Sequence, residues 1–381
     1  MKKITDFDFK DKRVLMRVDY NVPVDRQNRI TDDSRIRASL ITLNFLLKKN
    51  ARQVIIMTHF GRPKGIDESL RIGFIAQRLS ELLSQPVKKM DDCIDITLPP
   101  DRIVLLENLR FHKEEEADDE DFAKKLASLG DVYVNDAFGV SHRAHASVHA
   151  ITKFIPSCAG FLMMAEVENL AKIIDNPKRP FVAVIGGAKE DKIEVIKNLI
   201  PKVDHLIISG MLANTFLKAK GCDLGASKYT PELIETAVSL MAQAGDKLVL
   251  PLDLVFADKF EAGAKTVIRD VESKDVSGLI GVDIGTKTIA CYTELLKKAK
   301  TVFWAGPIGV FEIPEFANGT KEIATFLSKL KSTRVIGGGD SAASIEVLGL
   351  KDKMTHVSTG GGASLEFVSG MKLPGIEVLE E

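Results

Sequence analysis

The sequence predicts an α/β protein made of two domains, each built on a doubly wound parallel sheet. Short apolar runs rich in β-branched residues alternate with longer segments of helical period along almost the whole chain. This alternation is typical of parallel strands covered by helices on both faces. The strands are too many for one compact sheet, and 381 residues fit two or three domains. A helical stretch at 161–174 is followed by Pro177 and Pro180, and two prolines so close together stop a helix and mark a connector.

The individual elements follow in chain order. In the first half we expect strands at 13–18, 54–57, 103–106 and 132–134, with helices at 34–48, up to about residue 83, and between the last two strands. In the second half we expect strands at 181–185, 206–208, 248–250, 301–304, 334–336 and 356–358. The closing segment 373–379 is apolar enough to dock on the folded chain. The acidic run 114–121 predicts the solvated first turn of a helix, where negative charge is favourable.

Composition excludes several classes of protein. A hydrophobic fraction of 45% rules out a largely disordered chain. The balance of 52 Lys and Arg against 53 Asp and Glu gives no excess charge for binding nucleic acid, so no nucleic-acid partner is expected. No apolar segment approaches the roughly 18–20 residues of a membrane helix, and the first residues do not resemble a signal peptide. The four cysteines are far apart and form no C-x-x-C pair, which predicts free thiols in a cytoplasmic protein rather than a zinc site.

Three glycine clusters in the second half share one design, an apolar strand followed by glycines and a helix start. They lie at 186–188, 337–339 and 360–362. Glycine lets backbone N–H groups approach a phosphate, and the helix N-terminus adds a favourable dipole. Tight turns without a ligand are the alternative, but three in one half favour nucleotide phosphates. The pattern is not a Walker A motif, and a dinucleotide fingerprint at 337–342 is weak because no acidic residue follows about twenty positions later.

Charged residues beside these clusters suit phosphoryl chemistry. Lys189 and Lys192 lie three apart at a helix opening, hence on one face, and could neutralise a phosphoryl group; two solvated lysines are the alternative. Asp340 is placed to hold Mg²⁺ beside the phosphates. Glu312 ends a rigid loop and could bind a ribose hydroxyl.

The first half carries histidines and arginines near the ends of its strands. Five of the seven histidines lie there. Arg35, Arg62, Arg110 and Arg143 each lie close to the predicted carboxyl end of a strand, where guanidinium groups would converge on a small anion. Taken singly, such arginines are more often surface ion pairs. The histidines could instead hold a metal, but no H-x-x-x-H or His/Cys pairing at ligand spacing supports this.

Eight ordered motifs covering most of the chain resemble phosphoglycerate kinase. They lie at 17–23, 58–65, 105–112, 133–147, 186–193, 304–312, 336–340 and 356–364. The resemblance implies two Rossmann-like domains joined by a hinge helix. It places a 3-phosphoglycerate-binding domain at 1–165, with the tail 370–381 packed back on it, and a nucleotide-binding domain at 166–369. It also implies a monomer that closes its domains around 1,3-bisphosphoglycerate and ADP and transfers the phosphoryl group directly in line.

The resemblance also assigns site residues. For the substrate these are Asp19, Asn21, Arg35, His59, Arg62, Arg110 and Arg143. For catalysis they are Arg35, Lys189, Lys192, Gly339 and Gly362. For Mg-ATP or Mg-ADP they are Lys192, Gly210, Glu312, Gly338, Gly339, Asp340 and Ser341, with Asp340 as the Mg²⁺ ligand.

The implied chemistry fits this inventory. The acceptor is a carboxylate that is already ionised, so no general base is needed and catalysis reduces to positioning and charge neutralisation. The sequence departs from the family pattern by one residue fewer between Lys189 and Lys192, by Ser209–Leu212 in place of a three-glycine run, and by Ala305 in place of asparagine. Two alternatives remain, a binding protein of this fold that has lost turnover and a kinase for another acyl phosphate.

Overall fold

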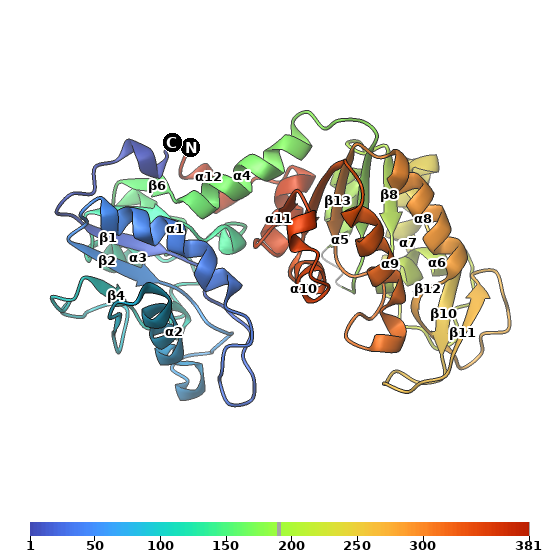
Figure 1. Cartoon of the computed structure of the whole chain (residues 1–381), viewed down its shortest axis with the longest axis horizontal. Helices are drawn as coiled ribbons and strands as arrows, with labels where there is room; N and C mark the ends of the chain where they lie inside the picture. The colour runs from blue at the N-terminus through green and yellow to red at the C-terminus, as the bar shows by residue number, and fades with distance from the viewer. Residues whose placement is uncertain (189–191, 381) are drawn as a thin grey trace. The chain divides into compact units, whose positions relative to one another are not determined.

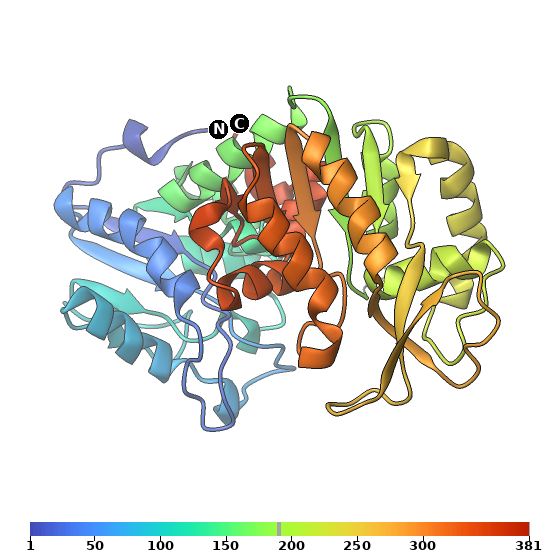
Figure 2. The same ribbon diagram turned by 45° about the vertical axis from the view of Figure 1, so that its right-hand side comes forward.

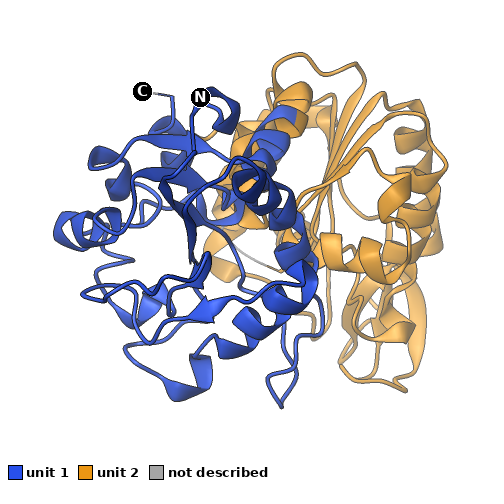
Figure 3. Ribbon diagram, turned by 60° about the vertical axis from the view of Figure 1, so that its left-hand side comes forward, with its two compact units in different colours: residues 1–168, 372–381 blue, residues 169–371 orange. Residues whose placement is uncertain are grey.

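The chain forms two compact units in a computed structural model that describes residues 1–188 and 192–380. Unit 1 contains residues 1–168 and 372–381, and unit 2 contains residues 169–371 (Figure 3). The boundary falls inside one helix, α4 (Phe161–Ile174). In the described part of the chain, no helix is both long and apolar enough to span a membrane.

Unit 1 is built on a six-stranded parallel sheet with the order β3-β4-β2-β1-β5-β6 (Figure 1). Its strands are β1 (Arg13–Arg17), β2 (Gln53–Met57), β3 (Lys88–Lys89), β4 (Ile103–Leu105), β5 (Val132–Asn135) and β6 (Ser157–Ala159). Its helices before α4 are α1 (Ser34–Lys48), α2 (Gly73–Leu83) and α3 (Glu120–Ala127).

Both faces of this sheet are buried. Val14 and Met16 of β1 join a core cluster that includes residues of α1 and α2. Leu15, which points to the opposite face, joins a second cluster that includes residues of α3. Such two-sided burial explains why the strands are continuous apolar runs in the sequence.

The two ends of the chain meet within unit 1, as Figure 2 shows. Lys2 N donates to Leu379 O at 2.8 Å. The short helix α12 (Pro374–Glu377) carries Gly375, whose N–H donates to Ser141 O at 2.9 Å. The side-chain amide of Asn135, at the end of β5, donates to Gly375 O at 3.2 Å. The C-terminal segment is therefore part of unit 1 although it follows unit 2 in the sequence.

Unit 2 has a second six-stranded parallel sheet with the order β15-β14-β13-β7-β8-β9. Its strands are β7 (Phe181–Ile185), β8 (His205–Ile208), β9 (Leu248–Val249), β13 (Thr301–Ala305), β14 (Thr333–Gly337) and β15 (His356–Val357). Its helices after α4 are α5 (Lys192–Leu199), α6 (Gly210–Ala219), α7 (Ile234–Ala244), α8 (Thr286–Lys298), α9 (Asn318–Ser328), α10 (Gly339–Val347) and α11 (Gly362–Ser369).

A small antiparallel sheet with the order β11-β10-β12 is the part of unit 2 that the sequence did not predict. It consists of β10 (Asp253–Ala257), β11 (Thr266–Asp270) and β12 (Ile280–Ile284). Positions along β11 alternate between exposed and half-buried, so this strand lacks the continuous apolar run by which the others were recognised.

The α/β class with two parallel sheets is confirmed. The helix expected at 34–48 and the strand expected at 181–185 have those bounds in the structure. The other expected strands differ by one or two residues at their ends.

Candidate active site

The predicted anion-binding residues of unit 1 lie after the carboxyl ends of neighbouring strands. The register pairs Arg17 at the end of β1 with Met57 of β2 and Asn135 of β5, so the segments after these strands emerge at one edge of the sheet. Asp19 and Asn21 follow β1, and His59 follows β2. Arg110 lies in the 3₁₀ turn Leu109–Phe111 after β4.

A chain of hydrogen bonds links four of these residues through Gly61. The Arg35 guanidinium, in the first turn of α1, donates to the Asp19 carboxylate. Asn21 N donates to Asp19 Oδ1 at 3.2 Å, and Asn21 Oδ1 accepts from Gly61 N at 3.0 Å. Arg110 Nη1 donates to Gly61 O at 2.8 Å. Arg35, Asp19, Asn21 and Arg110, although distant in sequence, thus form one connected assembly.

The Asp19 carboxylate is held in its ionised form. Burial would raise its pKa, but the charges of Arg35 and Arg17 and the hydrogen bond from the Asn21 backbone outweigh burial and lower the pKa below its ordinary value. Asp19 therefore remains a fixed acceptor for Arg35.

Arg17 is a site residue that the sequence analysis missed. Its side chain is fully buried. Arg17 Nε donates to Ser147 Oγ at 2.8 Å, and Arg17 Nη2 lies 3.4 Å from His59 Nδ1. An arginine can only donate, so Nδ1 of His59 accepts and a neutral His59 carries its proton on Nε2. The sequence feature that could have identified Arg17 is its position as a charged residue at the end of an apolar strand, directly before Val18 and Asp19.

Burial and neighbouring arginines disfavour the charged forms of three groups in this part of unit 1. Burial is the largest cause of each lowered pKa, and the fields of arginines add to it, while Asp19 opposes the shift of His59 and Glu116 opposes that of Arg110. His59 is lowered well below its ordinary value, His145 is lowered to about 3, and the pKa of Arg110 is also lowered. Arg17 and Arg110 contribute to the shift of His145, as does the exposed Arg143. A bound anion would relieve the electrostatic repulsion between these positively charged groups.

The acidic run at 114–121 is only partly the solvated helix start that was expected. Asp119 caps α3, with its side chain accepting from Phe122 N at 2.8 Å. Glu115, in contrast, is fully buried. It accepts from Ser147 Oγ at 2.6 Å and lies 3.6 Å from Arg17 Nη2. The solvated interpretation is wrong for Glu115 because its carboxylate compensates the buried arginine.

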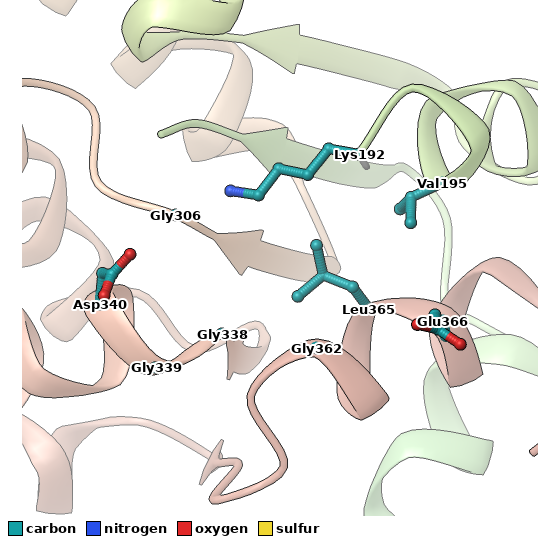
Figure 4. A pocket seen from close by; sticks show the side chains of 9 residues that line it. All are labelled: Lys192, Val195, Gly306, Gly338, Gly339, Asp340, Gly362, Leu365 and Glu366. Atoms are coloured by element: carbon teal, nitrogen blue, oxygen red, sulfur yellow. The ribbon is translucent and has the colours of Figure 1, made fainter. Parts of the chain in front are cut away.

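Glycines that follow three neighbouring strands of unit 2, β13, β14 and β15, line one open pocket, shown in Figure 4. The pocket holds about 540 Å³ of empty space, part of it open to solvent. It is lined by Lys192, Val195, Gly306, Gly338, Gly339, Asp340, Gly362, Leu365 and Glu366. Five of the predicted catalytic or nucleotide-binding residues are among them, namely Lys192, Gly338, Gly339, Asp340 and Gly362.

The glycine turns make room for the buried ammonium group of Lys192. This group donates to Gly186 O. A Cβ atom on Gly306 would lie 2.4 Å from Lys192 Nζ, and one on Gly187 would lie 2.9 Å from it. Both glycines have positive φ angles, +90° and +85°, where larger residues are strained. The lysine therefore needs glycine at both turns to reach its place in the pocket wall.

Two helix N-termini open on the same pocket. Gly339 begins α10 and Gly362 begins α11. The first N–H groups of a helix have no partner within the helix and, with the helix dipole, favour an anion. The Ser341 hydroxyl accepts from Gly306 N at 3.0 Å and donates to Gly337 O. Ser341 thus ties the turn after β13 to the start of α10, while its contact with nucleotide stays a prediction.

The remaining predicted residues lie elsewhere or outside the described chain. Gly210 begins α6 and packs on Gly187, where a Cβ would lie 2.5 Å from Gly187 N. Glu312 is exposed in a turn after β13. Arg62 is exposed directly after Gly61. Lys189 lies outside the described residues.

The donor chemistry of the pocket fits Mg²⁺. Asp340 is exposed at the start of α10 and lines the pocket next to the glycine turns. Magnesium is commonly bound through one or two carboxylates together with phosphate oxygens and water. A single protein carboxylate beside a phosphate-type turn meets that pattern.

Comparisons with known proteins give one consistent result. The family model described as phosphoglycerate kinase matches residues 4–371. The chain is 50% identical over 390 residues to a phosphoglycerate kinase of Dictyoglomus turgidum, covering 99% of this chain and 98% of the relative. It is 48% identical over 395 residues to one of Moorella thermoacetica, covering all of both. Among solved structures, it matches phosphoglycerate kinase from Pyrococcus horikoshii OT3 with a TM-score of 0.89 and 33% identity, over 100% of this chain and 98% of that one.

Proposed function

The chain belongs to the phosphoglycerate kinase family and has that family's activity, the ATP-generating step of glycolysis, and from this we propose how its own residues perform the reaction. Unit 1 binds 3-phosphoglycerate or 1,3-bisphosphoglycerate, and unit 2 binds ADP or ATP. The observation that carries the division is the contrast between the arginine cluster that follows the strands of unit 1 and the glycine-lined pocket of unit 2.

In unit 1, the side chains bind and orient the substrate. Arg62, Arg110 and Arg143, with Arg35 at the reacting end, hold its phosphate and carboxylate groups, which suit bidentate guanidinium contacts. Asp19 and Asn21 take the hydroxy-acid part. His59 acts as a neutral donor through Nε2, because Arg17 occupies its other nitrogen and its pKa is lowered by burial. Arg17 does not touch the substrate in this scheme and is a positioning residue.

In unit 2, the pocket stabilises charge on the moving phosphoryl group. The bond from its phosphorus to the acyl oxygen breaks and a bond to the β-phosphate oxygen of ADP forms, leaving a carboxylate. No proton moves, so no base is required. Lys189, Lys192, Arg35 and the N–H groups at Gly339 and Gly362 compensate the negative charge. Direct transfer requires the two bound substrates to meet, so we also propose that the domains close during the reaction.

The nucleotide is proposed to bind through Gly210, Glu312, Gly338 and Ser341 in addition to the pocket residues. Mg²⁺ would be held by Asp340 and would neutralise part of the charge of the nucleotide phosphates. We further propose that the enzyme is a cytoplasmic monomer; the free state of Cys93, Cys158, Cys222 and Cys291 supports a reducing compartment.

A coupled assay tests the proposal. Purified full-length protein is supplied with 3-phosphoglycerate and Mg-ATP, and formation of 1,3-bisphosphoglycerate is followed through a reductive coupling enzyme. Turnover is expected only when all components are present. Binding of both substrates by calorimetry without turnover would instead identify a protein that kept the fold and lost catalysis. Turnover with another carboxylate in preference to 3-phosphoglycerate would overturn the substrate assignment.

A further inference from the structure

A second group of chemistry-bearing side chains lies in unit 1, at residues that the phosphoglycerate reaction does not use. Asp92 and Cys93 are in the segment between β3 and β4, and His112 follows the 3₁₀ turn after β4. Asp92 and Cys93 are adjacent and His112 lies 19 positions after Cys93, a spacing that matches no recognised metal-binding motif. In the fold, one ligand atom from each lies within 4.8 Å of the others.

Asp92 connects the three residues by hydrogen bonds. Asp92 Oδ1 lies 2.6 Å from His112 Nε2 and accepts from Cys93 N at 2.7 Å. The Cys93 side chain is fully buried beside this pair. The three donors are therefore held together by the fold.

We propose that Asp92, Cys93 and His112 form a binding site for a thiophilic divalent transition metal, with Zn²⁺ as the best match. One sulfur, one nitrogen and one oxygen donor are the ligand types that zinc takes, and three protein ligands plus water complete a tetrahedron. Mg²⁺ and Ca²⁺ are disfavoured because they require oxygen donors. Binding releases the thiol proton to solvent, and the His112 nitrogen that binds the metal gives up any proton it shares with Asp92 to its other ring nitrogen or to solvent.

The geometry permits this exchange with small movements. Zinc bonds of roughly 2.0–2.3 Å place neighbouring tetrahedral ligands about 3.3–3.8 Å apart. The separation of 2.6 Å between Asp92 Oδ1 and His112 Nε2 lies below this range, and the ligand atoms of all three residues lie within 4.8 Å of one another. The side chains of Asp92 and His112 are 44% and 24% exposed and offer an entry path, while Cys93 supplies its thiol from the core.

Bound metal would join the segment after β3 to the segment after the 3₁₀ turn. That turn carries Arg110, which holds Gly61 O and belongs to the anion site. The proposed metal site is therefore separate from the anion-binding residues, although His112 lies only two positions after one of them, Arg110.

Cobalt titration of the full-length enzyme tests the proposal, because a cysteine thiolate bound to Co²⁺ gives a near-ultraviolet charge-transfer band. The protein is reduced with a phosphine and freed of metal before titration. We expect the band in the wild type at one equivalent and its displacement by Zn²⁺. Cys93→Ser should abolish the band, and His112→Gln should weaken apparent affinity by at least about tenfold.

Matched controls separate this site from adventitious binding. Cys222→Ser removes a half-buried thiol in unit 2 and should leave the band intact. His149→Gln removes a histidine whose Nδ1 lies 2.6 Å from Asp118 Oδ2, the same pairing as in the proposed site. In the described part of the chain no third metal-ligating donor joins that pair, so this variant should also bind normally.

Absence of the band in the wild type would overturn the proposal, and so would its persistence in Cys93→Ser. If that buried substitution prevents folding, as judged by circular dichroism, His112→Gln decides the question because its side chain is partly exposed. Unchanged affinity in His112→Gln would then exclude the site. The kinase assay is independent of this titration, so failure of one leaves the other intact.

Discussion

The sites proposed for a phosphorylated ligand in the two units are built in different ways. Unit 1 uses charged side chains, and Arg35 and Arg110 are fixed by hydrogen bonds that run through Asp19, Asn21 and Gly61. The site in unit 2 is built mainly from backbone. Glycine turns after neighbouring strands and two helix N-termini surround Lys192 and Asp340. The first design depends on the charge of its side chains, and the second depends on the absence of a Cβ.

This difference predicts which kind of substitution would disrupt each site. In unit 1, a substitution that removes one charge changes the electrostatic field and leaves the backbone in place. In unit 2, adding one methyl group at Gly186 or Gly306 displaces the backbone itself, because the atoms nearest to the missing Cβ include carbonyl oxygens. The predictions below test that distinction.

The largest effect is expected for Arg35→Ala, which removes a charge proposed to act on the transferring group. We expect kcat to fall by about 10²–10³-fold, as for loss of one transition-state donor, with little loss of stability since the side chain is partly exposed. Steady-state kinetics measures the change. Arg37→Ala is the matched control, because Arg37 lies on the same helix and pairs with Asp33 at 2.7 Å.

The control variant should keep kcat within about twofold, as expected for an exposed ion pair. A near-wild-type rate for Arg35→Ala would remove Arg35 from the catalytic group. An equal loss in both variants would show that α1 as a whole, and not the Arg35 charge, matters.

A smaller loss is expected for Gly306→Ala in unit 2. The new Cβ would lie 2.3 Å from Gly186 O and 2.4 Å from Lys192 Nζ, at a φ of +90°. Displacement of the turn by about 1 Å should lower kcat/KM about a hundredfold and also lower the melting temperature. The matched control is Gly349→Ala, which has a φ of +65° but nothing within 4 Å of its Cβ. The control should lose some stability through strain but keep its activity; equal activity loss would refute the steric explanation.

Particular residues show how far the sequence alone could go. The alternation of apolar runs and helical segments was sufficient for all six parallel strands of unit 2 and for four of the six in unit 1, because two-sided burial imposes it. It missed the short edge strands β3 and β6. Arginines at strand ends and glycines before helices were visible because each carries its chemistry in its own residue type. Arg17 and Glu115 were missed because their burial and pairing arise only when β1 meets the segment after β4. In the antiparallel sheet, β11 was missed because its positions alternate between exposed and half-buried, so the strand forms no continuous apolar run.

A still smaller effect is expected for Gly339→Ala, which separates binding from folding in unit 2. Gly339 has no atom within 4 Å of its missing Cβ and lines the pocket. The variant should fold with unchanged stability, while its methyl group takes space proposed for the nucleotide phosphates. We expect an increase of about tenfold in the KM for ATP, with the KM for 3-phosphoglycerate unchanged. An unchanged KM for ATP would place the phosphates away from this helix start.

The smallest predicted effect concerns a buried carboxylate in unit 2, Asp283, whose pH dependence is opposite in sign to that of Asp19 in unit 1. Asp283 accepts from Gly319 N at 2.7 Å and lies where a Cβ on Gly309 would be. Burial raises its pKa to about 7, although backbone hydrogen bonds from Gly319 and Ile284 oppose the shift. A raised pKa stabilises the fold below the unfolded value near 4, and this stabilisation is lost as the pH rises through about 7. The lowered pKa of Asp19 has the reverse effect, since its contribution is lost as the pH falls.

Asp283→Asn should therefore reduce the loss of stability between pH 6 and pH 8 by about 1 kcal/mol. This corresponds to roughly 2–4 °C in the melting temperature of a domain of this size. Thermal unfolding at both pH values measures the difference, with the exposed Asp246→Asn in the same unit as control. Because the buried amide keeps an acceptor for Gly319 N, a change in the pH slope isolates the charge from the hydrogen bond. An equal pH dependence of stability in wild type and Asp283→Asn would show that other groups set the pH response of unit 2. The proposed contrast between Asp283 and Asp19 would then be wrong.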